Sequence, residues 1–206
     1  MDTDLLERIR RVYTAVGTAE ESDLNNLKAS GISTDKMVGI VQDFRGGLSD
    51  EELCNIAHSV IHNIANLRNH LRRWAHLNGR DKKKVDEAAE KSMELQIIID
   101  LSNNDKHGYP PRNGGHSGKS PQVTEINRVM KLATRAQKAS TIGMTLGPGG
   151  VPKTFGDGTA KAVVTGRVVD NGNNPIGDLH DIATKAIEVW EGVLDEFGIG
   201  SATNGT

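Results

Sequence analysis

The chain has 206 residues, enough for one sizeable hydrophobic core, and we expect a single domain. Its 25 basic and 27 acidic side chains leave a formal net charge of −2, which excludes a general attraction to nucleic acids or anionic membranes and leaves only local basic surfaces. The single cysteine excludes an internal disulfide and a cysteine-built zinc site, so we expect a cytoplasmic protein. No run of about 18 apolar residues is present, so we expect no contact with a membrane.

Helical patterns dominate the first half of the chain. An apolar residue recurs every three or four positions near the N-terminus, at Leu5, Ile9, Val12 and Val16. This spacing predicts a first helix, and residues 19–30 and 33–46 are interpreted as two shorter helices.

The next helix carries the strongest local signal. Ser49 followed by Glu52 is a capping-box pattern, and Asn78-Gly79 is a stop signal. The apolar residues between them share one face, which we expect to be core, and are Leu53, Ile56, Ala57, Val60, Ile64, Leu67, Leu71 and Trp74. A second long helix is expected from Asp81 to just before Gly108, antiparallel to the first.

Composition changes after this helix pair, because residues 108–177 contain all six prolines. Within this region we predict two strands, at 124–133 and 160–170, separated by a loop over 141–158. Asp178 then caps a last helix that ends before Gly198.

These elements predict a mainly α fold. We expect a helical bundle with a long antiparallel helix hairpin and a small β-hairpin before the C-terminal helix. A single helical domain should cover residues 1–197, with 108–177 as a Gly/Pro-rich insertion, and residues 198–206 should form a disordered tail.

The stretch "GGHSGKS" at residues 114–120 suggests a phosphate-binding loop, but the spacing argues against it. Three residues rather than four separate Gly114 from Gly118, and Pro121 follows where a helix should begin. We therefore expect no nucleotide-binding loop of that type.

Two histidines could bind a metal ion. His58 and His62 are four residues apart on the helix that begins after Ser49, so their imidazoles can meet over one turn. No glutamate occupies the metalloprotease position between them, and spacing assigns no third ligand. The alternative is a solvated polar helix face.

A polar cluster interrupts the most apolar part of the following helix. One face of this helix carries Gln96, Asp100, Asn103 and His107. We assign Lys106 and His70 to the same polar cluster. Buried polar groups need partners, so the cluster is either structural or used for proton transfer. In an antiparallel pair its C-terminal end lies beside His58 and His62.

Seven basic residues fall within residues 66–84, and they are Arg68, Arg72, Arg73, Arg80, Lys82, Lys83 and Lys84. This local excess can bind an RNA backbone, or it can be a solvated surface. Aromatic residues make up only 3% of the chain, which argues against base stacking.

Two short motifs carry a resemblance. They are "HL-x-x-W", with His70, Leu71 and Trp74, and "N-x-x-K-H", with Asn103, Lys106 and His107. Over roughly residues 49–197 the chain resembles uncharacterised bacterial and phage proteins that are similar to HEPN helical bundles. That resemblance implies a ribonuclease that needs no metal, or a partner protein in toxin-antitoxin and phage-defence systems. The arginine-to-histidine spacing departs from the HEPN nuclease signature, since only three residues separate Arg72 from His76.

Three functional hypotheses follow. The first two require no cofactor, and the third requires a metal ion. The first is an interaction module that binds RNA, a protein partner or a second copy of itself. The second is a ribonuclease in which His107 or His76 acts on the 2′-hydroxyl, Asp100 orients the histidine, and Arg72 or Arg73 holds the phosphate. The third is a metal protein that uses His58 and His62.

Overall fold

The computed structural model describes residues 3–34, 37–136 and 139–199. Its helices are α1 (Thr3–Ala19), α2 (Asp50–Leu77), α3 (Lys83–Lys91), α4 (Met93–His107) and α5 (Leu179–Glu196). Its strands are β1 (Glu20–Glu21), β2 (Lys28–Thr34), β3 (Met37–Asp43), β4 (Gln122–Ala133), β5 (Ile142–Leu146), β6 (Pro152–Gly156), β7 (Thr159–Val169) and β8 (Pro175–Asp178). Short 3-10 turns occur at Leu24–Asn26, Arg112–Gly114 and Pro148–Gly150.

The β structure is more extensive than one hairpin. Strand β7 pairs antiparallel with β4, β1 and β8, and together they form a four-stranded sheet. Two further antiparallel pairs join β2 to β3 and β5 to β6. The prediction of a mainly helical bundle with one small β-hairpin is therefore wrong, and the fold is a mixture of α and β structure.

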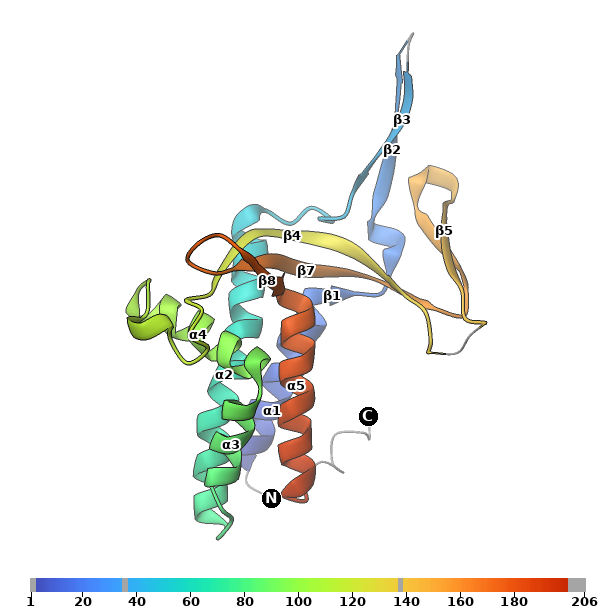
Figure 1. The fold of residues 1–206 in the computed structure, drawn as a ribbon. Coiled ribbons are helices and arrows are strands. Elements are labelled where there is room, and N and C mark those ends of the chain that lie inside the picture. Colours follow the sequence, from blue (N-terminus) through green and yellow to red (C-terminus); the bar gives the residue numbers. More distant parts are fainter. Residues whose placement is uncertain (1–2, 35–36, 137–138, 200–206) are drawn as a thin grey trace.

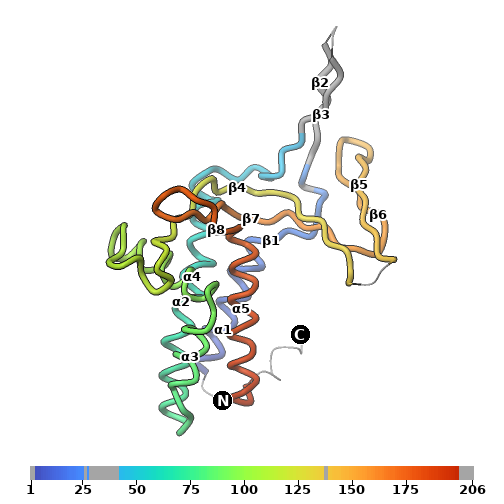
Figure 2. The backbone as a smooth tube through the Cα atoms, in the orientation of Figure 1, coloured from blue at the N-terminus to red at the C-terminus, as the bar shows by residue number. Residues whose placement is uncertain are grey.

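The helices stand side by side, and the long strands β4 and β7 lie across one end of them (Figure 1). The backbone trace shows the β5–β6 hairpin beyond the far ends of these two strands, away from the helices (Figure 2). Val164 and Val168 of β7 are buried in the same core as the helices. One core therefore joins the helices to the sheet.

Local signals place α2 and α5 correctly. The Ser49 hydroxyl accepts a hydrogen bond from the Glu52 N–H, and the Glu52 carboxylate accepts one from the Ser49 N–H, which confirms the capping box. The predicted stripe of α2 is buried except for Ile56, which is half-buried. Trp190 of α5 is 1% exposed and donates its indole N–H to the Ile64 carbonyl at 3.0 Å. This bond connects the middle of α5 to the middle of α2.

The second long helix is divided. Ser92 has extended backbone angles (φ −104°, ψ 115°), and its hydroxyl accepts a hydrogen bond from the Leu95 N–H, so it ends α3 and caps α4. A serine favours a cap over a helix interior because its hydroxyl competes for backbone groups. The change of direction lets α4 enter the core, where Leu95 and Ile98 are fully buried.

Other predicted elements are also wrong. The helices expected over 19–30 and 33–46 are replaced in the described residues by β1, a 3-10 turn, β2 and β3, and the loop expected over 141–158 contains the β5–β6 hairpin. Valine, isoleucine and threonine are frequent in residues 33–46, and β-branched residues favour strands. Residues 35–36, and 200–206 of the expected tail, lie outside the described residues.

Candidate functional site

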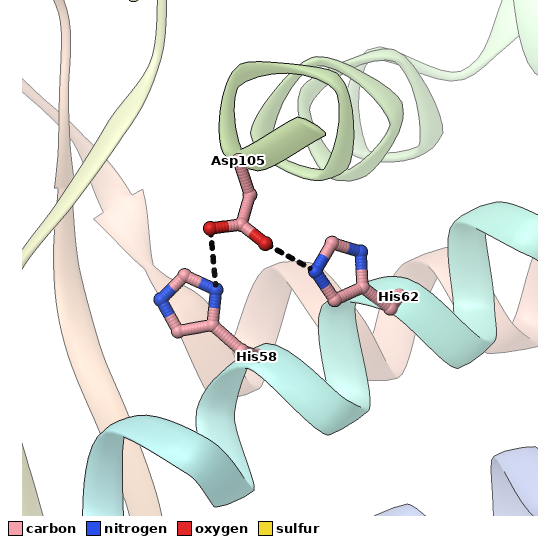
Figure 3. Close-up of side chains that lie close together, drawn as sticks. All are labelled: His58, His62 and Asp105. Carbon is pink, nitrogen blue, oxygen red and sulfur yellow. Dashed lines mark hydrogen bonds and ion pairs between the residues drawn. The ribbon is translucent and has the colours of Figure 1, made fainter. Parts of the chain in front are cut away.

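His58 and His62 of α2 converge with Asp105 of α4 (Figure 3). The His62 Nε2 atom lies 2.8 Å from Oδ2 of Asp105, and the His58 Nδ1 atom lies 3.8 Å from Oδ1 of the same carboxylate. The three candidate ligand atoms all lie within 4.8 Å of one another. The C-terminal end of α4 lies beside the N-terminal half of α2, so the two helices bring a histidine pair and a carboxylate to one point.

Ser102 supports the site through a hydrogen bond to His62. Its side chain is 1% exposed, and its hydroxyl lies 2.8 Å from Nδ1 of His62. Both ring nitrogens of His62 are therefore engaged, and the imidazole orientation is held from two sides. The hydrogen bond from His62 holds the pKa of the Asp105 carboxyl below its ordinary value.

Ser102, His62 and Asp105 have the residue types of a serine-hydrolase triad, but burial excludes that chemistry. A nucleophilic hydroxyl must reach the carbonyl of a substrate, and the Ser102 residue is 1% exposed. The arrangement instead resembles a metal-binding histidine whose second nitrogen is hydrogen-bonded to a supporting residue.

A second cluster of the same residue types, Asp178, His180 and Asp181, is filled by a side chain of the protein itself. The Lys131 ammonium lies 2.8 Å from a carboxylate oxygen of Asp178, 2.6 Å from one of Asp181 and 3.4 Å from Nδ1 of His180. A fixed positive charge already occupies the place that a cation would take. We therefore assign this cluster a structural role, joining β4 to the start of α5.

Glu20 extends this structural cluster, and it predicts a pH dependence of stability. Burial raises the pKa of Glu20, but hydrogen bonds from Lys161 and His180 outweigh burial and bring the pKa below its ordinary value. A lowered carboxyl pKa stabilises the folded state above the unfolded-state value of about 4.3, and the contribution is lost as the pH falls through the folded-state pKa.

The Glu20→Gln variant should accordingly be less stable than the wild type by about 1 kcal/mol at pH 7. We expect this difference to shrink as the pH falls through the lowered folded-state pKa of Glu20. Urea unfolding at pH 7, 5 and 3 measures it, with the exposed Glu188→Gln as the control. A Glu20→Gln variant that is as stable as the wild type at pH 7 would contradict the assigned ion pairs.

The structure does not bring the predicted catalytic residues together. Asp100 is buried and accepts hydrogen bonds from two backbone amides and a serine hydroxyl of a loop that follows α4, not from a histidine imidazole. His107 ends α4, whereas His76 lies 14 positions after His62 in α2, about 21 Å further along the helix. Arg72 faces Asp86 at 3.3 Å, and Arg73 is exposed next to it. This geometry gives the ribonuclease hypothesis no assembled site.

The predicted basic surface is partly neutralised. Arg68 binds Asp86 at 2.8 Å, and Lys84 binds Glu196. The exposed basic residues of the set that have no ion pair among the described contacts are Arg73, Arg80, Lys82 and Lys83. Phosphate attraction by this segment is therefore weaker than the sequence indicates.

The polar cluster is also dispersed. Gln96 donates to the Glu90 carbonyl at 2.6 Å, and Lys106 donates to the Asn66 side chain at 3.0 Å. His70 faces α1, where burial lowers the pKa of its imidazole. Asn103 is half-buried on α4.

Three candidate residues were missed from the sequence: Ser102 and Asp105 of this site, and His116 of the loop that binds Asp100. The spacing of three between Ser102 and Asp105 puts both on one face of α4, and this was the signal available in the sequence. Nothing in the sequence marks His116, because its position depends on the loop around Asp100.

No protein-family model, no curated protein and no solved structure matches this chain. The HEPN-like relationship and its defence context therefore stay predictions. Within the described ranges, no helix combines the length and the apolar character needed to cross a bilayer.

Proposed function

We propose that this protein binds one divalent transition-metal ion through His58, His62 and Asp105. The observation that carries the proposal is the convergence of three ligand atoms within 4.8 Å on two packed helices. Two imidazoles and a carboxylate suit borderline ions such as Zn²⁺. In tetrahedral geometry, ligand atoms about 2.0–2.2 Å from one zinc ion are about 3.3–3.6 Å apart. The distances from His62 Nε2 to Oδ2 of Asp105 (2.8 Å) and from His58 Nδ1 to Oδ1 (3.8 Å) lie on either side of this range.

Ser102 supports both the free and the metal-bound forms of His62. A serine hydroxyl can donate or accept a hydrogen bond. In the free protein, His62 can donate from Nε2 to Asp105 while its Nδ1 accepts from Ser102. A metal bound at Nε2 would place the imidazole proton on Nδ1, from which it would be donated to the Ser102 hydroxyl. In both states the Nδ1 atom of His62 keeps its hydrogen bond to Ser102.

Three protein ligands define an open site. Structural zinc sites have four protein ligands, whereas a three-ligand site keeps a position for water or for another molecule. The partial exposure of His58 and Asp105 agrees with such an open position. The ribonuclease and interaction hypotheses stay predictions, and the ribonuclease hypothesis has no comparable grouping of side chains among the described residues.

Metal stoichiometry tests the proposal. Tag-free protein is dialysed against micromolar Zn²⁺, and bound metal is measured by elemental analysis. We expect about one equivalent in the wild type and in His107→Ala, which removes a histidine at the end of α4. We expect none in the His58→Ala/His62→Ala double variant. The proposal would be overturned if the wild-type protein bound no zinc, or if the double variant bound a full equivalent.

A further inference from the structure

The loop that contains the "GGHSGKS" stretch is built around a buried carboxylate. Asp100 is 1% exposed. Its Oδ1 accepts the His116 N–H at 2.7 Å, and its Oδ2 accepts the Ser117 N–H at 2.8 Å and the Ser117 hydroxyl at 2.7 Å. The loop amides that a phosphate-binding loop would offer to a ligand are thus already bound to a protein carboxylate.

Two further contacts hold the ends of this loop. The Asn104 side chain donates to the Pro121 carbonyl at 2.8 Å, and the Ser120 N–H donates to the Gly114 carbonyl at 2.8 Å. Anchors on α4 and within the loop therefore define the backbone position of His116. A charged group buried solely to shape a surface loop suggests that the loop places a side chain for use.

His116 lines an open pocket of about 340 Å³ between α2, α3 and α4. Ala89 and Ile99, which are 3% and 7% exposed, form a small apolar floor, and Arg68, Glu90 and Gln96 supply polar groups. This volume lies near the lower end of the range for small-molecule sites, and the lining is more polar than in most of them. The pocket lies away from His58 and His62, neither of which lines it.

Arg68 is fixed for recognition of an anion. Its Nε and Nη2 atoms bind one oxygen of Asp86, at 3.2 and 2.8 Å, while Arg72 lies 3.3 Å from the other oxygen. Two guanidinium groups share the Asp86 carboxylate, which balances only one of them, while the Glu90 carboxylate lines the same pocket. A guanidinium has five N–H donors, and those not facing Asp86 can bind a phosphate together with the His116 imidazole.

We infer that this pocket binds a nucleoside monophosphate. The phosphate would be held by Arg68 and His116, the flat base would lie on Ala89 and Ile99, and Glu90 would accept a hydrogen bond from an amino group of the base. Free phosphate meets only the first requirement, and a nucleoside meets only the other two. The inference is independent of the metal site.

Histidine NMR tests this inference, with AMP, GMP, CMP, UMP, adenosine and inorganic phosphate as probes. The chain has seven histidines, and the His116 ring signal is the one missing in His116→Ala. We expect at least one nucleotide to shift this signal, with an affinity about tenfold above that of phosphate or adenosine. His116→Ala should weaken that nucleotide about tenfold.

Lys119→Ala is the matched control, because it removes a positive charge from the same loop at a position that does not line the pocket. It should change the affinity less than about twofold. The inference is overturned if no nucleotide shifts the His116 signal at a concentration of about 10 mM. A dissociation constant above roughly this value would be too weak for a specific site. It is also overturned if phosphate binds as tightly as every nucleotide, or if His116→Ala binds like the wild type.

Discussion

Replacing Asp105 with alanine is expected to lower the affinity for Zn²⁺ more than about a hundredfold. Asp105 is the proposed ligand from α4, and without it a pair of histidines on one helix turn remains. Loss of a residue that merely supports a ligand already weakens metal binding about 10–100-fold. Loss of the ligand itself should exceed that range. Competition with a chromophoric chelator measures the affinity.

Ser102→Ala provides a graded comparison. It keeps all three ligands but removes the hydroxyl 2.8 Å from Nδ1 of His62, so we expect a loss of about tenfold. Glu188→Ala, an exposed carboxylate on α5, should have no effect. If Asp105→Ala bound Zn²⁺ as tightly as Ser102→Ala or the wild type, the ion would lie elsewhere on the histidine face.

Local signals predicted the elements that depend on neighbouring residues. The capping box at Ser49 and the cap at Asp178 placed the starts of α2 and α5, and the patterns at 124–133 and 160–170 placed β4 and β7. Strand β1 was missed because its structure depends on a distant partner. Glu20 and Glu21 pair with Val163 and Ala162, and two residues carry no periodicity of their own.

The candidate sites divide in the same way. The spacing of His58 and His62 is visible in the sequence because it belongs to one helix. The third ligand, Asp105, depends on how α4 packs against α2. The sequence also indicates that Asp100 needs partners, since it lies within an apolar segment. Its partners are backbone amides, and a backbone N–H has no residue type that could reveal it.

The close approach of Gly115 to Asp100 predicts a second large effect. A Cβ atom on Gly115 would lie 2.5 Å from Cγ of Asp100, and the residue has a φ of +78°. Gly115→Ala should therefore displace the carboxylate from its three hydrogen bonds. We expect a loss of about 3 kcal/mol in the free energy of unfolding, measured by urea denaturation. Hydrogen exchange of the His116 and Ser117 amides should become faster.

Gly118→Ala measures the cost of a positive φ without the steric contact to Asp100. Gly118 has a φ of +70°, but a Cβ atom there would meet nothing within 4 Å, so this substitution should lose only about 1 kcal/mol. In an Asp100→Ala background the contact at Gly115 is gone, and Gly115→Ala should then lose about 1 kcal/mol as well. The resulting coupling of about 2 kcal/mol would belong to the Asp100–Gly115 contact. Equal losses for Gly115→Ala and Gly118→Ala in the wild type would show that Asp100 does not hold this loop, and His116 would then lack the anchored position that its proposed ligand requires.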